Sequence, residues 1–402
     1  MRATKRWAIL SLLLSPAGLA AQNSMTSSPY SMFGIGEIAS GLYGQTTAMA
    51  GVSIGMRERM FMNQENPAGL TALDSCTLLA EASAFAKSER YQSGGSSNNA
   101  FTGNFSAFAV GGRIRPRWYA SAGVTPYSFV GYYFTSREEV EGTPGSFYTS
   151  TYEGNGGLSK AYLSQAFRLT KHLSAGVNLN YIFGNMTQTE TQSSMVVTRE
   201  MSGSSFHADL GLQYHRPVGR ETFLTVGAVY GYKQGITLKN TQTVKGSTTE
   251  TEYKKKKVQQ YLPQYIGVGA SVEHKKMTYG LDYMFRQYSA LSSGDSRVTF
   301  SDAHEWRLGL CYFPDGYSSG SYWKRVSYKM GASVSTPYMR LNSQSGLGYR
   351  VSAGLELPVL NGRINAAFYY DHLQLRSDAL RRGIIGFTVT YTLGERFHKV
   401  KL

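Results

Sequence analysis

The stretch that decides the fold of this chain is LSAGVNLNYIF, residues 173–183. Its apolar residues stand mostly at every second position, and small or polar residues fill the positions between them. Because successive side chains of a β-strand point to opposite faces, this segment would have one apolar and one polar face. The same alternation recurs in Phe206–Tyr214 and in Tyr349–Leu357. We count fourteen such segments from about Cys76 onward, which predicts an all-β fold.

The lengths of the connections separate a membrane barrel from a soluble sandwich. Tight turns are predicted at Arg113–Arg117, Thr170–Leu173, Arg216–Glu221, His274–Met277 and Pro358–Gly362, and a somewhat longer one at Pro314–Lys324. The intervening loops, such as Thr135–Gly157, Gly184–Gly203 and Gly235–Gln260, are long and polar. Short turns on one rim and long loops on the other are typical of outer-membrane barrels. The sequence therefore predicts a transmembrane antiparallel β-barrel of about 14 strands over residues 76–402, in the outer membrane of a Gram-negative cell.

The first residues have the order of an export signal. A basic segment, residues 2–6, precedes the apolar run Trp7–Leu14, and Leu19–Ala21 offers small residues for cleavage. This pattern predicts a signal peptide over residues 1–21. The apolar run is too short to cross a bilayer as a helix, which takes about 20 residues.

The composition fits a barrel and argues against a nucleic-acid partner. The 29 Tyr, 19 Phe and 44 Gly residues suit the aromatic girdles and the curved strands of a barrel wall. The formal net charge of +15 would favour nucleic acid, but the export signal argues against it. For the basic cluster Lys254–Lys257 two interpretations stay open, a solvated loop or attraction to anionic lipid head groups. Cys76 and Cys311, on the first and tenth predicted strands, are too far apart for a disulfide.

Residues 22–75 differ from the rest of the chain. They are rich in Gly, Ala and Met, show no period of two, and are too few to hold a core of their own. We predict that this segment is a hatch that plugs the lumen of the barrel. In Asn66-Pro67-Ala68 the proline restricts the backbone, and Asn66 can cap a short helical turn over Ala68–Leu73. The candidates for lining a hydrophobic ligand are hatch residues expected to meet the inner wall: Met49, Ile54, Met60 and Phe61.

Several of these motifs together resemble a known family. Gly41–Gly51 followed by Asn66–Leu70 looks like the N-terminal hatch of the FadL/TodX transporters of hydrophobic compounds. Leu262–Gly269 and Tyr279–Tyr283 are similar to two neighbouring strands of that family. The opening Ser28–Gly36 and the closing Gly394–Phe397 look most like a branch found in Bacteroidota. The resemblance implies a monomeric fourteen-strand barrel with a plugging hatch, which moves hydrophobic molecules inward across the outer membrane without ATP.

Catalysis is not expected. Ser205, His207 and Asp209 share the inward face of one strand, but neighbours on one face lie about 6.5 Å apart, too far for the direct hydrogen bonds of a triad. We interpret them as polar lumen residues. Other charged groups are predicted to face inward and to pair across strands: Arg168, Asp282, Arg286, Glu305, Arg307, Lys329, Glu356 and Asp371. No His/Cys cluster has metal-ligand spacing and no glycine loop cradles phosphate, so neither a metal nor another cofactor is predicted.

Two functions remain open. The first is passive uptake of hydrophobic small molecules, fatty-acid-like or aromatic, by a hatch-gated and lateral route. The second is a non-transporting FadL-like barrel that serves as an accessory subunit of an outer-membrane secretion or assembly complex, as the PorV branch serves protein secretion. The expected partners are outer-membrane lipids and lipopolysaccharide, a hydrophobic ligand for the first function, and other subunits for the second.

Overall fold

The computed structural model describes residues 28–396 except 76, 94–95, 140–141, 144, 292–297, 315–319, 342–344 and 376–380. The predicted signal peptide, residues 1–21, and Cys76 lie outside the described residues. Among the described residues, no helix is both long and apolar enough to cross a membrane.

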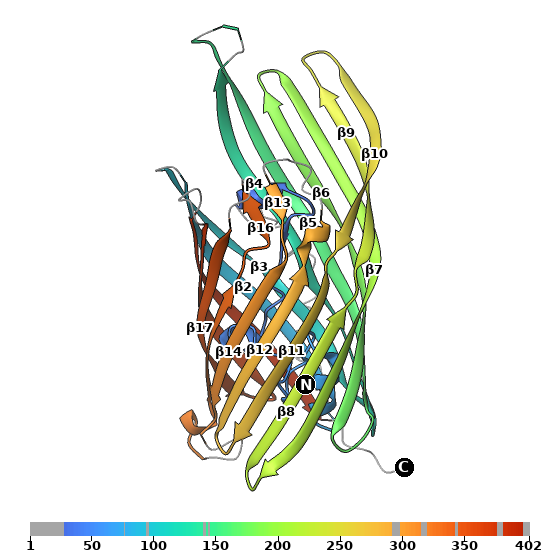
Figure 1. The fold of residues 1–402 in the computed structure, drawn as a ribbon, viewed down its shortest axis with the longest axis vertical. Coiled ribbons are helices and arrows are strands. Elements are labelled where there is room, and N and C mark those ends of the chain that lie inside the picture. Colours follow the sequence, from blue (N-terminus) through green and yellow to red (C-terminus); the bar gives the residue numbers. More distant parts are fainter. Residues whose placement is uncertain are drawn as a thin grey trace, which may run out of the picture.

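Residues 77–396 form a closed antiparallel β-barrel (Figure 1). In wall order the strands are β2 (Thr77–Ser93), β3 (Ser96–Arg115), β4 (Trp118–Glu139), β5 (Phe147–Arg168), β6 (Leu173–Gln192), β7 (Met195–Gly219), β8 (Thr222–Gly231) continued by β9 (Gln234–Lys245), β10 (Glu250–Leu262) continued by β11 (Gln264–His274), β12 (Met277–Gln287), β14 (Ala303–Tyr312), β15 (Ser327–Ser335), β17 (Gly346–Val359), β18 (Gly362–Leu375) and β19 (Arg381–Arg396). Because β19 pairs with β2 along its whole length, the sheet closes on itself. The wall has fourteen strand positions, which confirms the sequence-based count.

Shorter elements lie inside the barrel or at its two rims. They are the 3-10 helices η2 (Pro29–Met32), η3 (Pro67–Ala72), η4 (Tyr288–Ala290) and η6 (Trp323–Arg325), the α-helix α2 (Gln45–Ala48), and the strands β1 (Glu37–Ile38), β13 (Val298–Phe300) and β16 (Met339–Leu341). β13 pairs with β16 and forms a small separate sheet near the outer opening (Figure 1). Cys311 is buried on β14, the tenth wall position, as predicted.

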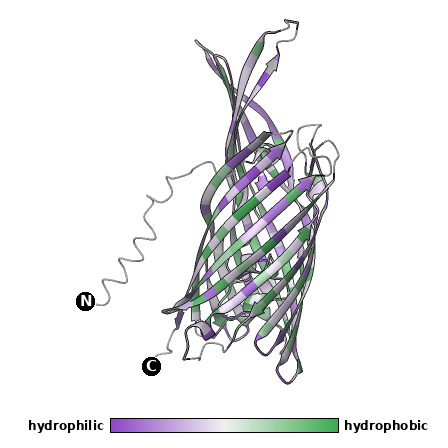
Figure 2. Ribbon diagram, turned by 90° about the vertical axis from the view of Figure 1, so that its left-hand side faces the viewer, coloured by the Kyte–Doolittle hydropathy of each residue, from purple (hydrophilic) through white to green (hydrophobic). Residues whose placement is uncertain are grey.

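The alternation seen in the sequence turns apolar side chains toward lipid. On β11 the side chains of Ile266 and Val268 are 51% and 50% exposed, whereas Gly267 and Gly269 between and after them face inward. Figure 2 shows hydrophobic and hydrophilic residues following one another along the wall strands. An apolar outer band over a polar interior is the arrangement that a barrel in a bilayer requires.

The prediction that the long polar segments are loops is wrong, because most of their residues form paired strands. The β6–β7 turn comprises only Ser193 and Ser194, and β4 pairs with β5 as far as Glu139 and Phe147. These segments are long hairpins that rise from one side of the barrel, together with β9–β10 (Figure 1). Beyond the bilayer both faces of a strand meet water, so the apolar period of two is lost although the backbone ladder continues. We call the projecting parts of β4–β7, β9 and β10 the tall wall.

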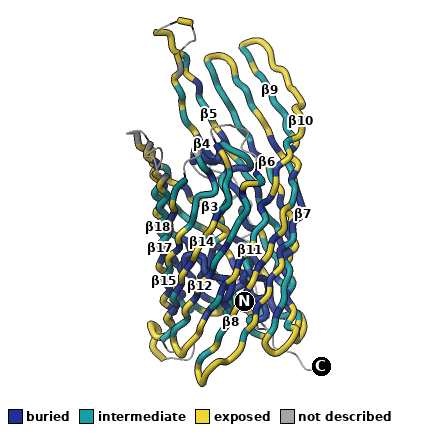
Figure 3. The backbone as a smooth tube through the Cα atoms, in the orientation of Figure 1, coloured by how far each residue is buried: buried dark blue, intermediate teal, exposed yellow. Residues whose placement is uncertain are grey.

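Residues 28–75, here called the hatch, pass through the barrel and pack against its inner face. Figure 3 shows the buried residues gathered in the half of the barrel that carries the short turns. Eight successive wall positions each present a glycine to the hatch, at residues 354, 331, 309, 280, 269, 227, 211 and 176. A Cβ at any of these glycines would lie within 3.0 Å of a hatch atom or of an adjoining wall atom. The wall therefore lacks side chains where the hatch crosses it, and the hatch packs directly on the backbone of the wall.

Candidate functional site

Asn66 holds the hatch to itself and to the wall. Its side chain accepts a hydrogen bond from the Ala68 amide at 3.2 Å, which makes it the N-cap of the 3-10 helix that Pro67 begins. Its Nδ2 donates to the carbonyl oxygens of Ile54 and of Leu212 on β7, at 2.8 and 3.1 Å. Asn66 and Ala68 are completely buried. The sequence predicted this cap, and the cross-links to Ile54 and Leu212 explain why an amide side chain stands here.

Three hatch carboxylates form ion pairs with basic residues of the wall. Glu65 lies 2.7 Å from the Arg307 guanidinium, Glu58 lies 3.6 Å from the Lys329 ammonium, and Glu37 lies 2.6 Å from the Arg382 guanidinium. Burial raises the pKa of Glu37, but the positive charges of Arg382 and Lys87 outweigh it and hold that pKa below its usual value. Sequence reasoning found the inward wall charges but missed these hatch partners.

Several of the inward charges also pair across neighbouring strands, as predicted, whereas Arg168 donates to the Thr71 carbonyl of the hatch and to Tyr119. Arg307 of β14 contacts Glu305 on the same strand at 2.8 Å, and Glu305 contacts Arg286 of β12 at 2.9 Å. Lys329 pairs with Glu356, and Asp282 accepts the backbone amides of Ser53 and Ile54 at 2.7 and 2.9 Å. The middle of the lumen is therefore a bonded ionic network that joins the wall to the hatch.

The four candidate ligand-lining residues lie in packed surroundings. Met49 and Ile54 are completely buried, Met49 against Val52, Met56 and Cys311, and Ile54 against Val229 and Met284. Met60 packs beside the cluster of Met62 and Leu70, apart from Met49 and Ile54. Phe61 packs against Tyr43 and Ala107. Of the four residues it alone lines a cavity described below, the smaller of the two. Their role toward a ligand stays a prediction.

Ser205, His207 and Asp209 do not form a catalytic arrangement. The prediction that their spacing keeps His207 and Asp209 apart is wrong, because Nδ1 and Oδ1 are 3.0 Å apart. Side chains lean along a strand, which brings these two together. However, His207 Nε2 faces the Tyr232 carbonyl at 2.8 Å, and Ser205 Oγ donates to the Gly235 carbonyl at 2.7 Å. Among the described residues the serine hydroxyl is therefore bonded to backbone carbonyls and not to His207. Among the described residues no group of His, Cys, Asp and Glu side chains could hold a metal ion.

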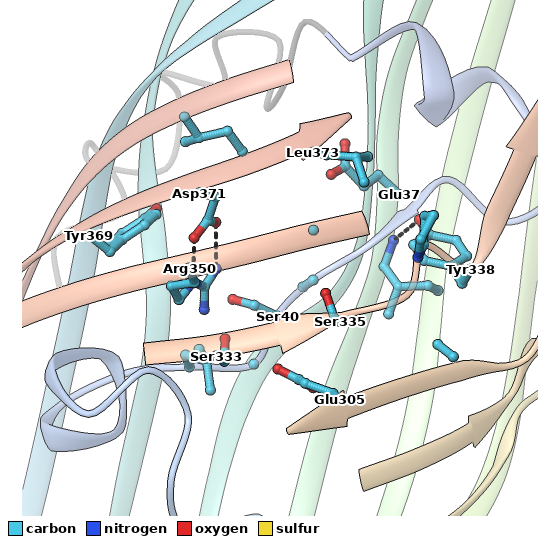
Figure 4. Close-up of a pocket in the computed structure, with 18 of the residues that line it drawn as sticks. Glu37, Ser40, Glu305, Ser333, Ser335, Tyr338, Arg350, Tyr369, Asp371 and Leu373 are labelled. Carbon is cyan, nitrogen blue, oxygen red and sulfur yellow. Dashed lines mark hydrogen bonds and ion pairs between the residues drawn. The ribbon is translucent and has the colours of Figure 1, made fainter. Parts of the chain in front are cut away.

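Two cavities flank the hatch. The larger, about 360 Å³, lies between hatch residues 37–42 and strands that include β2, β4, β17, β18 and β19. Its wall carries the ion pair of Arg350 with Asp371, 2.6 Å between Nη2 and Oδ2, beside Tyr369 and Ser333 (Figure 4). The smaller, about 160 Å³, is lined by Phe61, Lys160, His207 and Asp209 among others. Both cavities are lined by charged and hydroxyl groups as well as by aromatic rings.

The wall is not paired throughout. β3 and β4 pair from Arg115–Trp118 up to Phe108–Val124, where their ladder ends. Beyond that point β3 continues beside β2 alone and β4 continues beside β5, with only residues 128 and 129 of β4 paired to β1 of the hatch. We call the boundary between β3 residues 96–107 and β4 residues 125–139 the seam.

A proline marks the place where the seam opens. Pro126 follows Val124 by two residues, and proline has no amide hydrogen to donate to a ladder. The pairing of β4 with β5 is also irregular between Pro126 and Ser128. A proline inside an otherwise strand-like run was the sequence signal that could have located the seam.

Together these features define an outer-membrane barrel of fourteen strands with its lumen occupied by the N-terminal segment. Residues 3–389 match the model of the family described as BamG, so the chain belongs to the BamG family. Comparison with curated protein sequences gave no match.

Solved structures with the same fold include several channels and transporters. The Pseudomonas putida toluene transporter TodX aligns with 14% identity over 90% of this chain and 99% of its own, with a TM-score of 0.59. The Ralstonia pickettii toluene transporter TbuX aligns with 17% identity over 89% of this chain and 98% of its own, with a TM-score of 0.55. A Pseudomonas aeruginosa FadL homologue aligns with 10% identity over 91% of this chain and 100% of its own, with a TM-score of 0.58. At these identities the likeness shows a FadL-like fold, and the Bacteroidota branch stays a prediction.

Proposed function

We propose that this barrel is a non-catalytic accessory subunit of an outer-membrane secretion or assembly complex, and that it binds its partner through the tall wall. The observation that carries the proposal is the one-sided height of the barrel. Strands β4, β5, β6 and β7 have 22, 22, 20 and 25 residues, whereas β12, β14 and β15 have 11, 10 and 9.

Strands β4–β7 are about twice as long as a membrane crossing requires. A strand crosses a bilayer with about 9–11 residues. The remaining ten or so residues of the long strands extend about 33 Å along the strand at about 3.3 Å per residue. A sheet of this size in water normally gains its stability from packing against another layer. The tall wall is a large, regular surface on one side of the opening, which suits a protein partner.

The lumen supports the same proposal. A molecule crossing it would have to displace the hatch from the eight wall glycines and break the contacts of Glu65 with Arg307 and of Asn66 with Leu212. Arg307 is only 2% exposed, and removing one partner from such a buried charged pair costs about 3–5 kcal/mol. The family name, BamG, is in keeping with a subunit of a larger assembly.

The test is to shorten one hairpin of the tall wall without touching the barrel. Asn240 and Lys255 face each other across β9 and β10, so residues 241–254 can be replaced by Asn-Gly, a two-residue hairpin turn. We expect the shortened protein to fold and to lose a partner that co-purifies with the wild type. The matched control replaces only the turn residues 246–249 with Asn-Gly and keeps the partner. Equal recovery of the partner with both variants would contradict the proposal.

Passive uptake of a hydrophobic molecule by a lateral route is the second candidate, and the seam favours it. The larger cavity is lined by Phe85 of β2, Ser106 of β3 and Phe129 of β4, so it lies directly behind the seam. A small aromatic or fatty-acid-like molecule could leave the cavity sideways into the bilayer there. Uptake of a labelled aromatic hydrocarbon by cells with and without the protein tests this route, and equal uptake would contradict it.

A further inference from the structure

The upper part of β3 has one free edge. Residues 97–107 are paired with β2 on one side, with a register shift near Ser83 and Ala84. On the seam side, none of the strand pairings among the described residues involves this part of β3. In a β-strand, alternate residues direct their N–H and C=O groups to opposite sides. About half of the residues of this segment therefore present both backbone groups to the seam.

The part of this free edge around Phe101 and Phe105 carries apolar side chains on its outer face. Phe101 and Phe105 point outward with 77% and 40% of their surface exposed. They continue the outward row of Phe108, Val110 and Ile114, which lies on the paired part of the same strand. Lipid chains have no hydrogen-bonding groups, so a backbone group of this edge that meets lipid carries a large free-energy penalty unless it finds a partner.

The hatch does not supply that partner. β1 pairs with Phe129 and Ser128, which belong to β4, the strand on the other side of the seam. Among the described residues, the Phe105 amide of this segment donates to the side chain of the adjacent Asn104 at 2.7 Å. The remainder of the edge is open to a strand that approaches along the membrane plane.

The free edge of β3 and the edge of β10 that faces away from β9 differ in their protection. The edge formed by β10 carries Lys254–Lys257 and a register shift between Lys255 and Val258, two devices that discourage pairing with another chain. The free segment of β3, SSNNAFTGNFSA, contains neither lysine nor proline. These two devices are therefore present on the edge of β10 and absent from the free segment of β3.

We propose that β3 residues 96–107 accept an extended strand of a second outer-membrane protein, which adds to the wall at the seam. Only a polypeptide backbone offers donors and acceptors at the regular spacing of this edge, and such strand addition is a known mode of recognition. The partner strand would carry apolar residues at every second position, since its outer face would meet lipid as Phe101 does. This inference rests on the accessory-subunit function proposed above.

Photo-crosslinking in living cells tests the strand addition. A photoreactive amino acid replaces Phe101 on the free edge, and in a matched control it replaces Phe368, which is 64% exposed on β18 and lies between two paired strands. We expect one discrete protein adduct from position 101 and none from position 368. Lipid adducts alone at both positions would overturn the inference.

A second pair of variants probes the edge itself. Asn99 is exposed on the free segment, so Asn99→Lys adds a charge of the kind that protects β10, whereas Asn99→Gln keeps the side chain neutral. We expect Asn99→Lys to reduce the adduct at position 101 at least tenfold and Asn99→Gln to leave it unchanged, with the heat-modifiable gel shift of the barrel intact in both. Equal adduct yields would overturn the inference.

The two proposals fail in distinguishable ways. If position 101 gives no protein adduct while the partner still co-purifies and is lost on shortening β9–β10, the seam inference fails and the accessory function stands. If no partner co-purifies with the wild type either, the accessory function fails as well.

Discussion

Substitution of a single wall glycine should loosen the hatch while leaving the barrel closed. In Gly227→Ala the new Cβ would lie 2.1 Å from the Ile54 carbonyl oxygen and 2.9 Å from Nδ2 of Asn66. The first neighbour is backbone, so it cannot rotate away, and the hatch must withdraw by about 1.3 Å, from 2.1 Å to the 3.4 Å at which ordinary contact begins. Overpacking of this kind costs about 1–3 kcal/mol.

The control for this substitution is a glycine of the same wall with free space. A Cβ at Gly383 of β19 would meet the Tyr370 hydroxyl at 3.7 Å, an ordinary contact. Gly383→Ala should therefore change stability by less than about 1 kcal/mol. We would measure protease cleavage within the hatch, vancomycin sensitivity of the cells and the heat-modifiable gel shift. Gly227→Ala should raise the first two and keep the third. The reasoning is refuted if Gly227→Ala and Gly383→Ala behave alike in all three measurements.

Three further predictions follow from the hatch contacts and the topology. Asn66→Ala removes the hydrogen bonds to Ile54 and Leu212 and the cap on the Ala68 amide. Since an unsatisfied buried group costs about 1–3 kcal/mol, the hatch should loosen, and vancomycin sensitivity should rise with an unchanged gel shift. A variant that leaks no more than wild type contradicts this prediction. Arg307→Met leaves the Glu65 carboxylate without its closest cation and should lower the free energy of unfolding by about 3–5 kcal/mol in denaturant titration; a loss below about 1 kcal/mol would contradict it. A cysteine at Thr249 should react with an impermeant reagent on intact cells and one at Lys275 should not; the reverse pattern would invert the topology.

The sequence predicted the barrel because a membrane imposes a strong pattern. One face of each spanning strand must be apolar, so the period of two, the strand count and the short turns could all be read from residues such as those of 173–183. The tall wall was read as loops because no lipid acts on it, and a strand with two wet faces has no such period. Backbone pairing alone, as between Glu139 and Phe147, leaves little trace in composition.

The site was predicted less completely than the fold. The capping role of Asn66 could be predicted because Asn66 directly precedes Pro67, and this local pattern is visible in a single sequence. The partners of Arg307 and Lys329 could not be read, because Glu65 and Glu58 reach them across more than two hundred residues of chain. The glycines of the wall were taken as aids to curvature, whereas eight of them make room for the hatch. Such contacts depend on the path of the hatch, which carries no periodic signal.

The central claim, that the tall wall binds a partner, is tested most directly by a native mass spectrum of the gently extracted protein. The account predicts a species of the barrel with one stoichiometric protein partner, and its loss when residues 241–254 are replaced by Asn-Gly. A spectrum showing the barrel alone or with a small apolar ligand, the same for both proteins, would contradict it.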